Sequence, residues 1–208
     1  MFRLLLARHG ATEWSADHRF QGVSDVSLSP LGRRQAELLG QRLRGESINA
    51  CYSSNLKRAI DTARAAIAGR KQLDVEPRPE LRELHFGVFE GLTPTEIDGS
   101  YAREFEEWSQ RRTWRGMTQL SPPGGESLAQ LQTRLVPFIA GLEERHSDET
   151  VLVVCHNGPL RVAVCHWLGL GLDHWWQLQT DHASLTILES GQRGRVMALF
   201  NDTCHLRE

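Results

Sequence analysis

The sequence has no long hydrophobic run and no strong excess of charge of one sign. No stretch approaches the roughly 18 apolar residues of a membrane span, and the apolar run at residues 2–7 is too short for the core of a signal peptide. The 24 lysines and arginines nearly balance the 26 aspartates and glutamates, which gives a formal net charge of -2. A transmembrane segment and a basic surface for nucleic acid or anionic lipid are therefore not expected. We expect a soluble, cytoplasmic protein without nucleic-acid or membrane partners.

Cysteines are few and scattered along the chain. The four of them are Cys51, Cys155, Cys165 and Cys204, and no two form a Cys-x-x-Cys pair. Zinc-binding and dithiol redox motifs therefore have no support, and we predict reduced, mostly buried thiols. With 208 residues, of which 40% are hydrophobic, the chain is long enough to bury a core without a disulfide or a metal. We expect a single domain over residues 1–208 with a modest insertion.

Strand-like and helix-like segments alternate along the chain. Short apolar runs predict strands at residues 2–7, 48–53, 151–155, 184–188 and 195–200, the last two joined by a glycine turn at residues 191–194. Apolar stripes at helical spacing predict helices after the Ser29-Pro30 cap and at residues 56–68, 127–146 and 157–168. Pro137 should kink or break the long third helix. This alternation predicts an α/β fold, a three-layer α/β/α sandwich around a mostly parallel sheet.

Between about residues 92 and 123 the periodic pattern weakens, which indicates an insertion. We predict a short lid over the carboxyl edge of the sheet, since lids exclude water and select substrates. Trp108 and Trp114 would either stack on a planar base or be buried within this lid. Its arginines would either face solvent or bind a second anionic group of the substrate, such as a carboxylate. They are Arg111, Arg112 and Arg115.

Two histidines directly follow predicted strands, His9 after the first and His156 after the most strand-like run. The carboxyl ends of parallel strands meet at one edge of a sheet, where ligands bind, so we expect both side chains at the same site. Arg8 precedes the first histidine, and Arg58 lies in the first turn of a predicted helix. Guanidinium groups and helix N-termini both favour phosphate, and a neutral imidazole is a competent nucleophile near neutral pH. These residues favour a phosphate-bearing ligand but do not by themselves name a reaction.

The Arg8-His9-Gly10 sequence resembles the signature of the histidine phosphatase superfamily, which includes the cofactor-dependent phosphoglycerate mutases. Further segments resemble motifs of this family in the same order along the chain. They are residues 25–32, 53–62, 81–91, 124–127, 154–158 and 201–206. The resemblance covers nearly the whole chain, and the ordered set is far more specific than the first triplet alone. It implies a phosphoglycerate mutase-like fold.

The resemblance also implies a mechanism. His9 would attack phosphorus and become a phosphohistidine, while its second ring nitrogen donates to a backbone carbonyl. Arg8, Arg58 and His156 would hold the oxygens of the transferring group. Glu83 would protonate the leaving oxygen and then take a proton from the attacking water, which calls for a pKa raised by partial desolvation. The cationic cluster takes the place of a metal, so the resemblance implies no cofactor and no metal site.

The chain departs from the family pattern beside the nucleophile. Many relatives have an asparagine after the tryptophan of this loop, where this chain has Ser15 after Trp14. Ser15, Thr12 and Gln21 are then expected to share the phosphate contacts. The other substrate-binding residues expected from the matching segments are Gly22, Asn157, His85 and His205, the last two as contacts to the rest of the substrate.

Mutases and phosphatases of the family differ in how they hold the rest of the substrate. The mutases have an arginine directly after the acid-loop glutamate, where this chain has Leu84. They also have a longer segment between an Arg-Arg pair and the Glu-Ser motif, which here follows soon, at residues 126–127. A short lid would retain a bisphosphate poorly and admit water, so hydrolysis is favoured.

We therefore predict a metal-independent phosphomonoester hydrolase for a small phosphorylated metabolite. The candidate substrates are α-ribazole phosphate, phosphoserine, and a sugar or glycerate phosphate. A cofactor-dependent phosphoglycerate mutase is the alternative, because Arg111-Arg112 resembles the arginine pair of those enzymes. A binding protein with a dead site is disfavoured, because the set of catalytic residues is complete. A homodimer through the terminal strand is a further expectation.

Overall fold

A six-stranded sheet lies at the centre of the computed structural model, which describes residues 1–110, 116–192 and 194–207. The strands are β1 (Phe2–Arg8), β2 (Ala50–Ser54), β3 (Val75–Arg78), β4 (Thr150–Cys155), β5 (Leu185–Gly191) and β6 (Gly194–Asp202). Their order across the sheet is β3-β2-β4-β1-β5-β6. The first four strands of this order pair in parallel, whereas β5 runs antiparallel to both of its neighbours, β1 and β6. The predicted, mostly parallel sheet is confirmed.

Helices connect most of the strands. They are α1 (Glu13–Ala16), α2 (Pro30–Arg42), α3 (Lys57–Ala66), α4 (Pro94–Ser100), α5 (Ala102–Ser109), α6 (Gly116–Gln119), α7 (Leu128–Arg145) and α8 (Asn157–Leu168). Short 3-10 segments occur at η1 (Pro79–Leu81), η2 (Gly87–Phe89), η3 (Leu172–Gln177) and η4 (Cys204–Leu206). Over the described part of the chain, no helix is long and apolar enough to span a bilayer.

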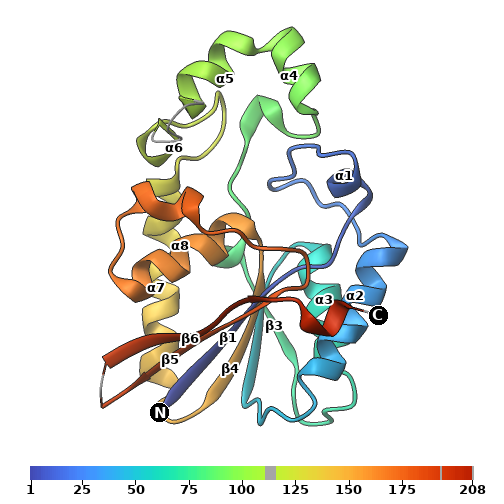
Figure 1. Cartoon of the computed structure of the whole chain (residues 1–208), viewed down its shortest axis with the longest axis vertical. Coiled ribbons are helices and arrows are strands. Elements are labelled where there is room, and N and C mark those ends of the chain that lie inside the picture. Colours follow the sequence, from blue (N-terminus) through green and yellow to red (C-terminus); the bar gives the residue numbers. More distant parts are fainter. Residues whose placement is uncertain (111–115, 193, 208) are drawn as a thin grey trace.

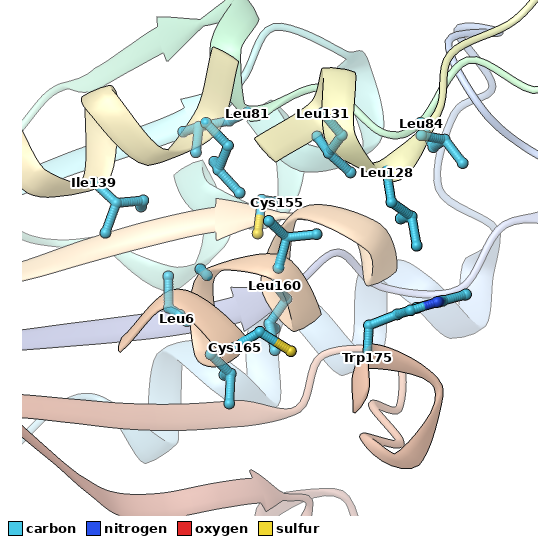
Figure 2. Close-up of a cluster of buried hydrophobic side chains, with 14 of the residues drawn as sticks. Leu6, Leu81, Leu84, Leu128, Leu131, Ile139, Cys155, Leu160, Cys165 and Trp175 are labelled. Atoms are coloured by element: carbon cyan, nitrogen blue, oxygen red, sulfur yellow. The ribbon is translucent and has the colours of Figure 1, made fainter. Parts of the chain in front are cut away.

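Side chains of β1 alternate between two buried clusters, one on each face of the sheet. Leu4 and Leu6 belong to one cluster, and Leu5 and Ala7 belong to the other. Helices α7 and α8 cover the first face, and α2 and α3 cover the second (Figure 1). Figure 2 shows the first cluster, in which side chains of α7 lie over β4 and α8. The three layers expected from the sequence are therefore present.

The helix α7 runs from Leu128 to Arg145 without a break, although Pro137 lies inside it. Its N-terminus is closed by a capping box in which the side chains of Ser127 and Gln130 each accept a hydrogen bond from the backbone N–H of the other residue. A proline inside a helix costs about 3 kcal/mol. Each buried apolar side chain stabilises by about 1.5–3 kcal/mol, and the buried stripe of α7 contains several. These are Leu128, Leu131, Leu135, Ile139 and Leu142. Of the two predicted effects of Pro137, a kink or a break, the break is therefore wrong.

The edge strand β3 was not expected from the sequence. Two of its four residues are exposed and the others are only partly buried, so it lacks the apolar pattern of the inner strands. It contains Pro77, which an edge strand tolerates because one side of its backbone needs no partner. Pairing with β2, rather than local preference, fixes this segment as a strand.

The segment 92–123 contains α4, α5 and α6, which lie beyond the carboxyl end of β1 (Figure 1). Trp108 of α5 is only 2% exposed, and its ring centroid lies 5.5–6.4 Å from those of Phe20, Phe86, Phe89 and Phe105. Of the two interpretations of Trp108, burial is the one that the structure supports. Arg111, Arg112, Trp114 and Arg115 lie outside the described residues.

Candidate active site

A cavity of about 540 Å³ opens where β1 and β4 end and where the chain enters β5. Because β5 is antiparallel to β1, its first residues lie at the same edge of the sheet as the last residues of β1. We refer to this space as the His9 cavity. Its lining residues are Arg8, His9, Ser15, His18, Arg19, Phe20, Gln21, Glu83, Phe86, Asn157 and His182.

His9 is held in the site as a neutral ring. Its Nδ1 lies 2.7 Å from the carbonyl oxygen of Gly10. A carbonyl oxygen only accepts, so Nδ1 carries the proton and Nε2 keeps its lone pair. Burial, followed by the charges of Arg58 and Arg8, holds the pKa of His9 well below its usual range. The predicted bond from the second ring nitrogen to a backbone carbonyl is therefore present.

The guanidinium of Arg8 is held by the segment that precedes β5. Nη1 donates to the carbonyl of Thr180 at 2.7 Å, and Nη2 lies 2.9 Å from Nε2 of His182. Burial lowers the pKa of Arg8, yet an arginine pKa starts so high that the group stays charged at neutral pH. Among the described residues, the buried Nε of Arg8 has no hydrogen-bond partner.

Arg58 is completely buried and is held by backbone carbonyls instead of by a carboxylate. Nη1 donates to Ser24 O and Nη2 to Gly22 O, each at 2.6 Å. Nε donates to Nδ1 of His156 at 3.3 Å. This bond makes Nδ1 of His156 an acceptor, so the proton of the neutral ring lies on Nε2.

His156 therefore presents an unused donor. Its Nε2 is buried and has no partner within the described part of the chain. Burial and the charges of Arg58 and Arg8 hold the pKa of His156 well below its usual range. Its ring centroid lies 4.9 Å from that of His9. The unpartnered donors on Arg8 and His156 fit an anion beside the nucleophile, because a buried polar group without a partner is costly.

Glu83 is buried at the N-terminus of α8. Its Oε1 accepts from the backbone N–H of Leu84 at 2.8 Å and from that of Gly158 at 3.0 Å. Burial raises the pKa of Glu83, although these N–H groups and the charges of Arg58 and Arg8 act in the opposite direction. A Cβ at position 158 would clash with Oε1 of Glu83 and displace the carboxyl group. The predicted direction of the pKa shift of Glu83 is confirmed.

The structure brings most of the secondary site residues to the His9 cavity or to its wall. Thr12 is buried and donates from Oγ1 to Oε1 of Gln21 at 2.7 Å, while Nε2 of Gln21 is buried without a partner among the described residues. Ser15 lines the cavity, but its Oγ already donates to Thr12 O at 2.7 Å. Gly22 contributes its carbonyl to Arg58, and Oδ1 of Asn157 accepts from the hydroxyl of Thr180 at 2.7 Å.

Two expected substrate contacts do not reach this cavity. His85 lines a neighbouring cavity of about 500 Å³, and its Nδ1 accepts from the backbone N–H of Gly87. His205 lies with Nε2 3.0 Å from the carbonyl of Ala183, in the segment η4 that packs against α2. The motif segments place these residues near the sheet edge, but their side chains bond to backbone groups outside the cavity.

His182 also belongs to this site and was not predicted from the sequence. Its ring centroid lies 5.6 Å from that of His9, and burial together with the charge of Arg8 lowers the pKa of His182 to about 3. The side chains of His18, Arg19, Phe20 and Phe86 also line the cavity and were not expected. His182 lies just before the strand predicted at residues 184–188. This position would have indicated the site only if that strand had been predicted to run antiparallel to the first strand, because its beginning then lies beside the end of the first strand.

The described residues contain no group of three or more His, Cys, Asp or Glu side chains arranged to hold a metal ion. All four cysteines are free, and three of them are buried, as predicted.

Comparisons with known proteins agree with this geometry. The sequence model of the histidine phosphatase superfamily (branch 1) matches residues 4–203. Phosphoserine phosphatase 1 of Hydrogenobacter thermophilus is 36% identical over 208 residues, which is 100% of this chain and 96% of the relative. YhfR of Bacillus stearothermophilus superposes with a TM-score of 0.88 at 31% identity, covering 100% of both chains. A mutant phosphoserine phosphatase from Entamoeba histolytica, solved in complex with phosphoserine, gives 0.83 at 27% identity, also covering 100% of both chains.

The chain belongs to branch 1 of the histidine phosphatase superfamily. It is a phosphatase of small phosphorylated metabolites, from a family of metal-independent hydrolases. The phosphoglycerate mutase-like fold expected from the sequence is confirmed.

Proposed function

We propose that the protein hydrolyses phosphomonoesters through a phosphohistidine formed on Nε2 of His9. The observation that supports this proposal is the tautomer of His9. Its Nδ1 donates to Gly10 O, so Nε2 is unprotonated and lies beside the buried donors of Arg8 and His156. In the first step the N–P bond forms while the bond from phosphorus to the leaving oxygen breaks. Glu83 gives its proton to that oxygen, and an alcohol is released.

Water completes the cycle. Glu83, now ionised, takes a proton from a water molecule, which attacks phosphorus and breaks the N–P bond. Inorganic phosphate leaves, and His9 returns to its neutral form. The charge on the transferring oxygens is stabilised by Arg8, Arg58 and the Nε2–H of His156, which are fixed before the substrate arrives.

Phosphoserine is the substrate that we favour among the predicted candidates. The support is similarity: a relative matched over the whole chain is a phosphoserine phosphatase, and another was solved with phosphoserine bound. α-Ribazole phosphate and sugar or glycerate phosphates remain the other members of the test panel. The segment 92–123 would act as the lid of the single domain, since α4, α5 and α6 lie beyond the catalytic edge of the sheet.

Hydrolysis is favoured over mutase activity by the position of Leu84. Leu84 stands directly after the acid-loop glutamate, where the mutases of the family have an arginine, and it is buried in the core at 2% exposure. It therefore presents no charge for holding a second phosphate. The cytoplasmic location and the homodimer stay predictions.

The test is a phosphatase panel in the presence of a chelator. The substrates are p-nitrophenyl phosphate, phosphoserine, α-ribazole phosphate and 3-phosphoglycerate. We expect turnover of at least one alkyl phosphate, trapping of acid-labile phosphoenzyme, and loss of both in His9→Ala. Absence of turnover by the wild type, or full turnover by His9→Ala, would overturn the mechanism. Conversion of 3- to 2-phosphoglycerate stimulated by the bisphosphate would show that the protein also has the mutase activity of the alternative.

A further inference from the structure

The acid Glu83 lies on a segment that has no regular secondary structure of its own. Residues 82–86 fall between η1 and η2 and belong to no helix or strand. The carboxyl group is anchored to α8 through Gly158, but the backbone that carries it needs a separate support. That support comes from α7.

Arg134 of α7 binds the backbone at the acid and three residues before it. Its Nη1 donates to the carbonyl of Glu80 at 2.6 Å, and its Nη2 donates to the carbonyl of Glu83 itself at 3.0 Å. The same guanidinium forms a bidentate pair with Glu126, from Nε to Oε1 at 2.8 Å and from Nη2 to Oε2 at 2.9 Å. The side chains of Arg134 and Glu126 are only 20% and 17% exposed.

Glu126 extends this support to the residues that follow Glu83. Its backbone N–H donates to the carbonyl of His85 at 2.8 Å, and its Oε2 lies 3.4 Å from the backbone nitrogen of His85. The Arg134–Glu126 pair therefore contacts the backbone before, at and after Glu83. A planar guanidinium has its donors in a fixed fork, so these contacts define one geometry.

We propose that Arg134 is a positioning residue that sets where the carboxyl group of Glu83 meets the leaving oxygen of the substrate. This inference rests on the proposed function of Glu83 as the acid. Arg134 does not line the His9 cavity, and its hydrogen bonds reach the acid through the backbone of Glu83. Its charge also lowers the pKa of His156, an effect that Arg134→Lys keeps and Arg134→Met removes. Displacement of a reacting group by about 1 Å can lower a rate by roughly 10²-fold. Such a displacement would weaken proton donation while leaving His9 and its arginines in place.

Leaving-group dependence separates this role from a merely structural one. An alkoxide leaving from phosphoserine needs a proton in the transition state, whereas p-nitrophenolate leaves as a stable anion. The ratio of kcat/KM for the two substrates, measured in the same preparation, is unaffected by the fraction of enzyme that is folded. The kcat/KM values report the step up to formation of the phosphohistidine, so later hydrolysis does not mask the effect.

The variants are Arg134→Lys and Arg134→Met, with Glu83→Gln as the reference for a lost acid. Glu83→Gln should lower kcat/KM for phosphoserine by roughly 10²–10⁴-fold and that for p-nitrophenyl phosphate much less. Both Arg134 variants should shift the ratio in the same direction by about tenfold to 10²-fold, because an ammonium keeps the charge but not the fork. They should also show a burst of p-nitrophenol, since Glu83 is needed again for hydrolysis of the phosphoenzyme.

The matched control is Arg195→Met. Arg195 forms an ion pair of 2.6 Å with Glu143 near the other end of the same helix α7, and its loss should leave the ratio unchanged. Equal losses on both substrates in the Arg134 variants, or no loss on either, would overturn the positioning role. A ratio restored to the wild-type value in Arg134→Lys would overturn the requirement for the fork.

Failure of the proposed function would give a different result, either no turnover by the wild type or normal turnover by His9→Ala. If another alkyl phosphate of the panel is turned over faster than phosphoserine, it replaces phosphoserine in the ratio.

Discussion

Stability should depend steeply on pH on the acid side, because three histidines of the site are buried where they cannot readily take up protons. Burial, followed by neighbouring cationic side chains, holds the pKa of His9 and His156 well below the ordinary 6.5 and lowers the pKa of His182 to about 3. In the unfolded chain the same rings should titrate near pH 6.5. Below that pH the unfolded chain binds more protons than the folded one, so stability falls as the pH falls.

The size of the effect follows from the proton count. Each histidine should lower the free energy of unfolding by about 1.4 kcal/mol between pH 7.5 and 5.5, so three should lower it by about 4 kcal/mol. Glu83 acts in the opposite sense: its folded-state pKa is raised, so the folded chain gains stability as the pH falls through that pKa. The net loss should therefore be about 2–4 kcal/mol, a large part of the 5–15 kcal/mol that is typical of folded domains.

The measurement is urea unfolding followed by the fluorescence of the 6 tryptophans, at 25 °C and at several pH values from 7.5 to 5.5. The buffers must lack phosphate, because a bound anion stabilises the folded state. His182→Asn should reduce the loss by about 1.4 kcal/mol, whereas His174→Asn, at an exposed position, should leave it unchanged. A loss below about 1 kcal/mol over this range in the wild type would refute the reasoning.

Other variants should separate stability from activity. Arg58→Met should lower kcat/KM by roughly 10³–10⁵-fold. Its free energy of unfolding should change by less than about 3 kcal/mol, since relief of the burial that lowers the pKa of Arg58 to about 10 offsets the lost bonds to two carbonyls. Arg70→Met removes two similar bonds away from the site and should destabilise the protein without loss of activity; the opposite pattern in either variant would contradict this account. Gly158→Ala should remove most activity because the new Cβ would displace Glu83, and normal kcat/KM would show that the acid does not depend on this contact. Cys204 is the one exposed thiol of the four, so a thiol reagent should titrate one group in the native protein and four in urea, with activity retained after the first.

The cluster of side chains around His9 could be predicted from the sequence because its residues directly follow predicted strands. Arg8 and His9 end a short apolar strand, and His156 follows another, so the parallel pairing of β1 with β4 brings them together. The roles of Arg58 and Glu83 were predicted because the segments that contain them resemble motifs of the family. Those roles stay predictions until the variants are measured.

The remaining features depend on tertiary contacts that a single sequence does not reveal. His182 reaches the site only because β5 is antiparallel to β1, and strand direction is not encoded by an apolar run. Pro137 is tolerated because α7 is held by its buried stripe, which outweighs the local cost of proline. His85 and His205 bond to backbone groups of Gly87 and Ala183, contacts that motif resemblance does not specify.

The contact between Arg8 and His182 joins residues 174 positions apart in the chain. During synthesis, a nascent chain that has not yet released residues 180–182 lacks both acceptors that hold the guanidinium of Arg8. On the proposed mechanism, catalysis should begin only when β5 has docked on β1, late in synthesis and after the first strand and most of the core have emerged. Recovery of phosphatase activity in a refolding experiment would accordingly report the closure of this last strand pair rather than the earlier collapse of the helices onto the sheet.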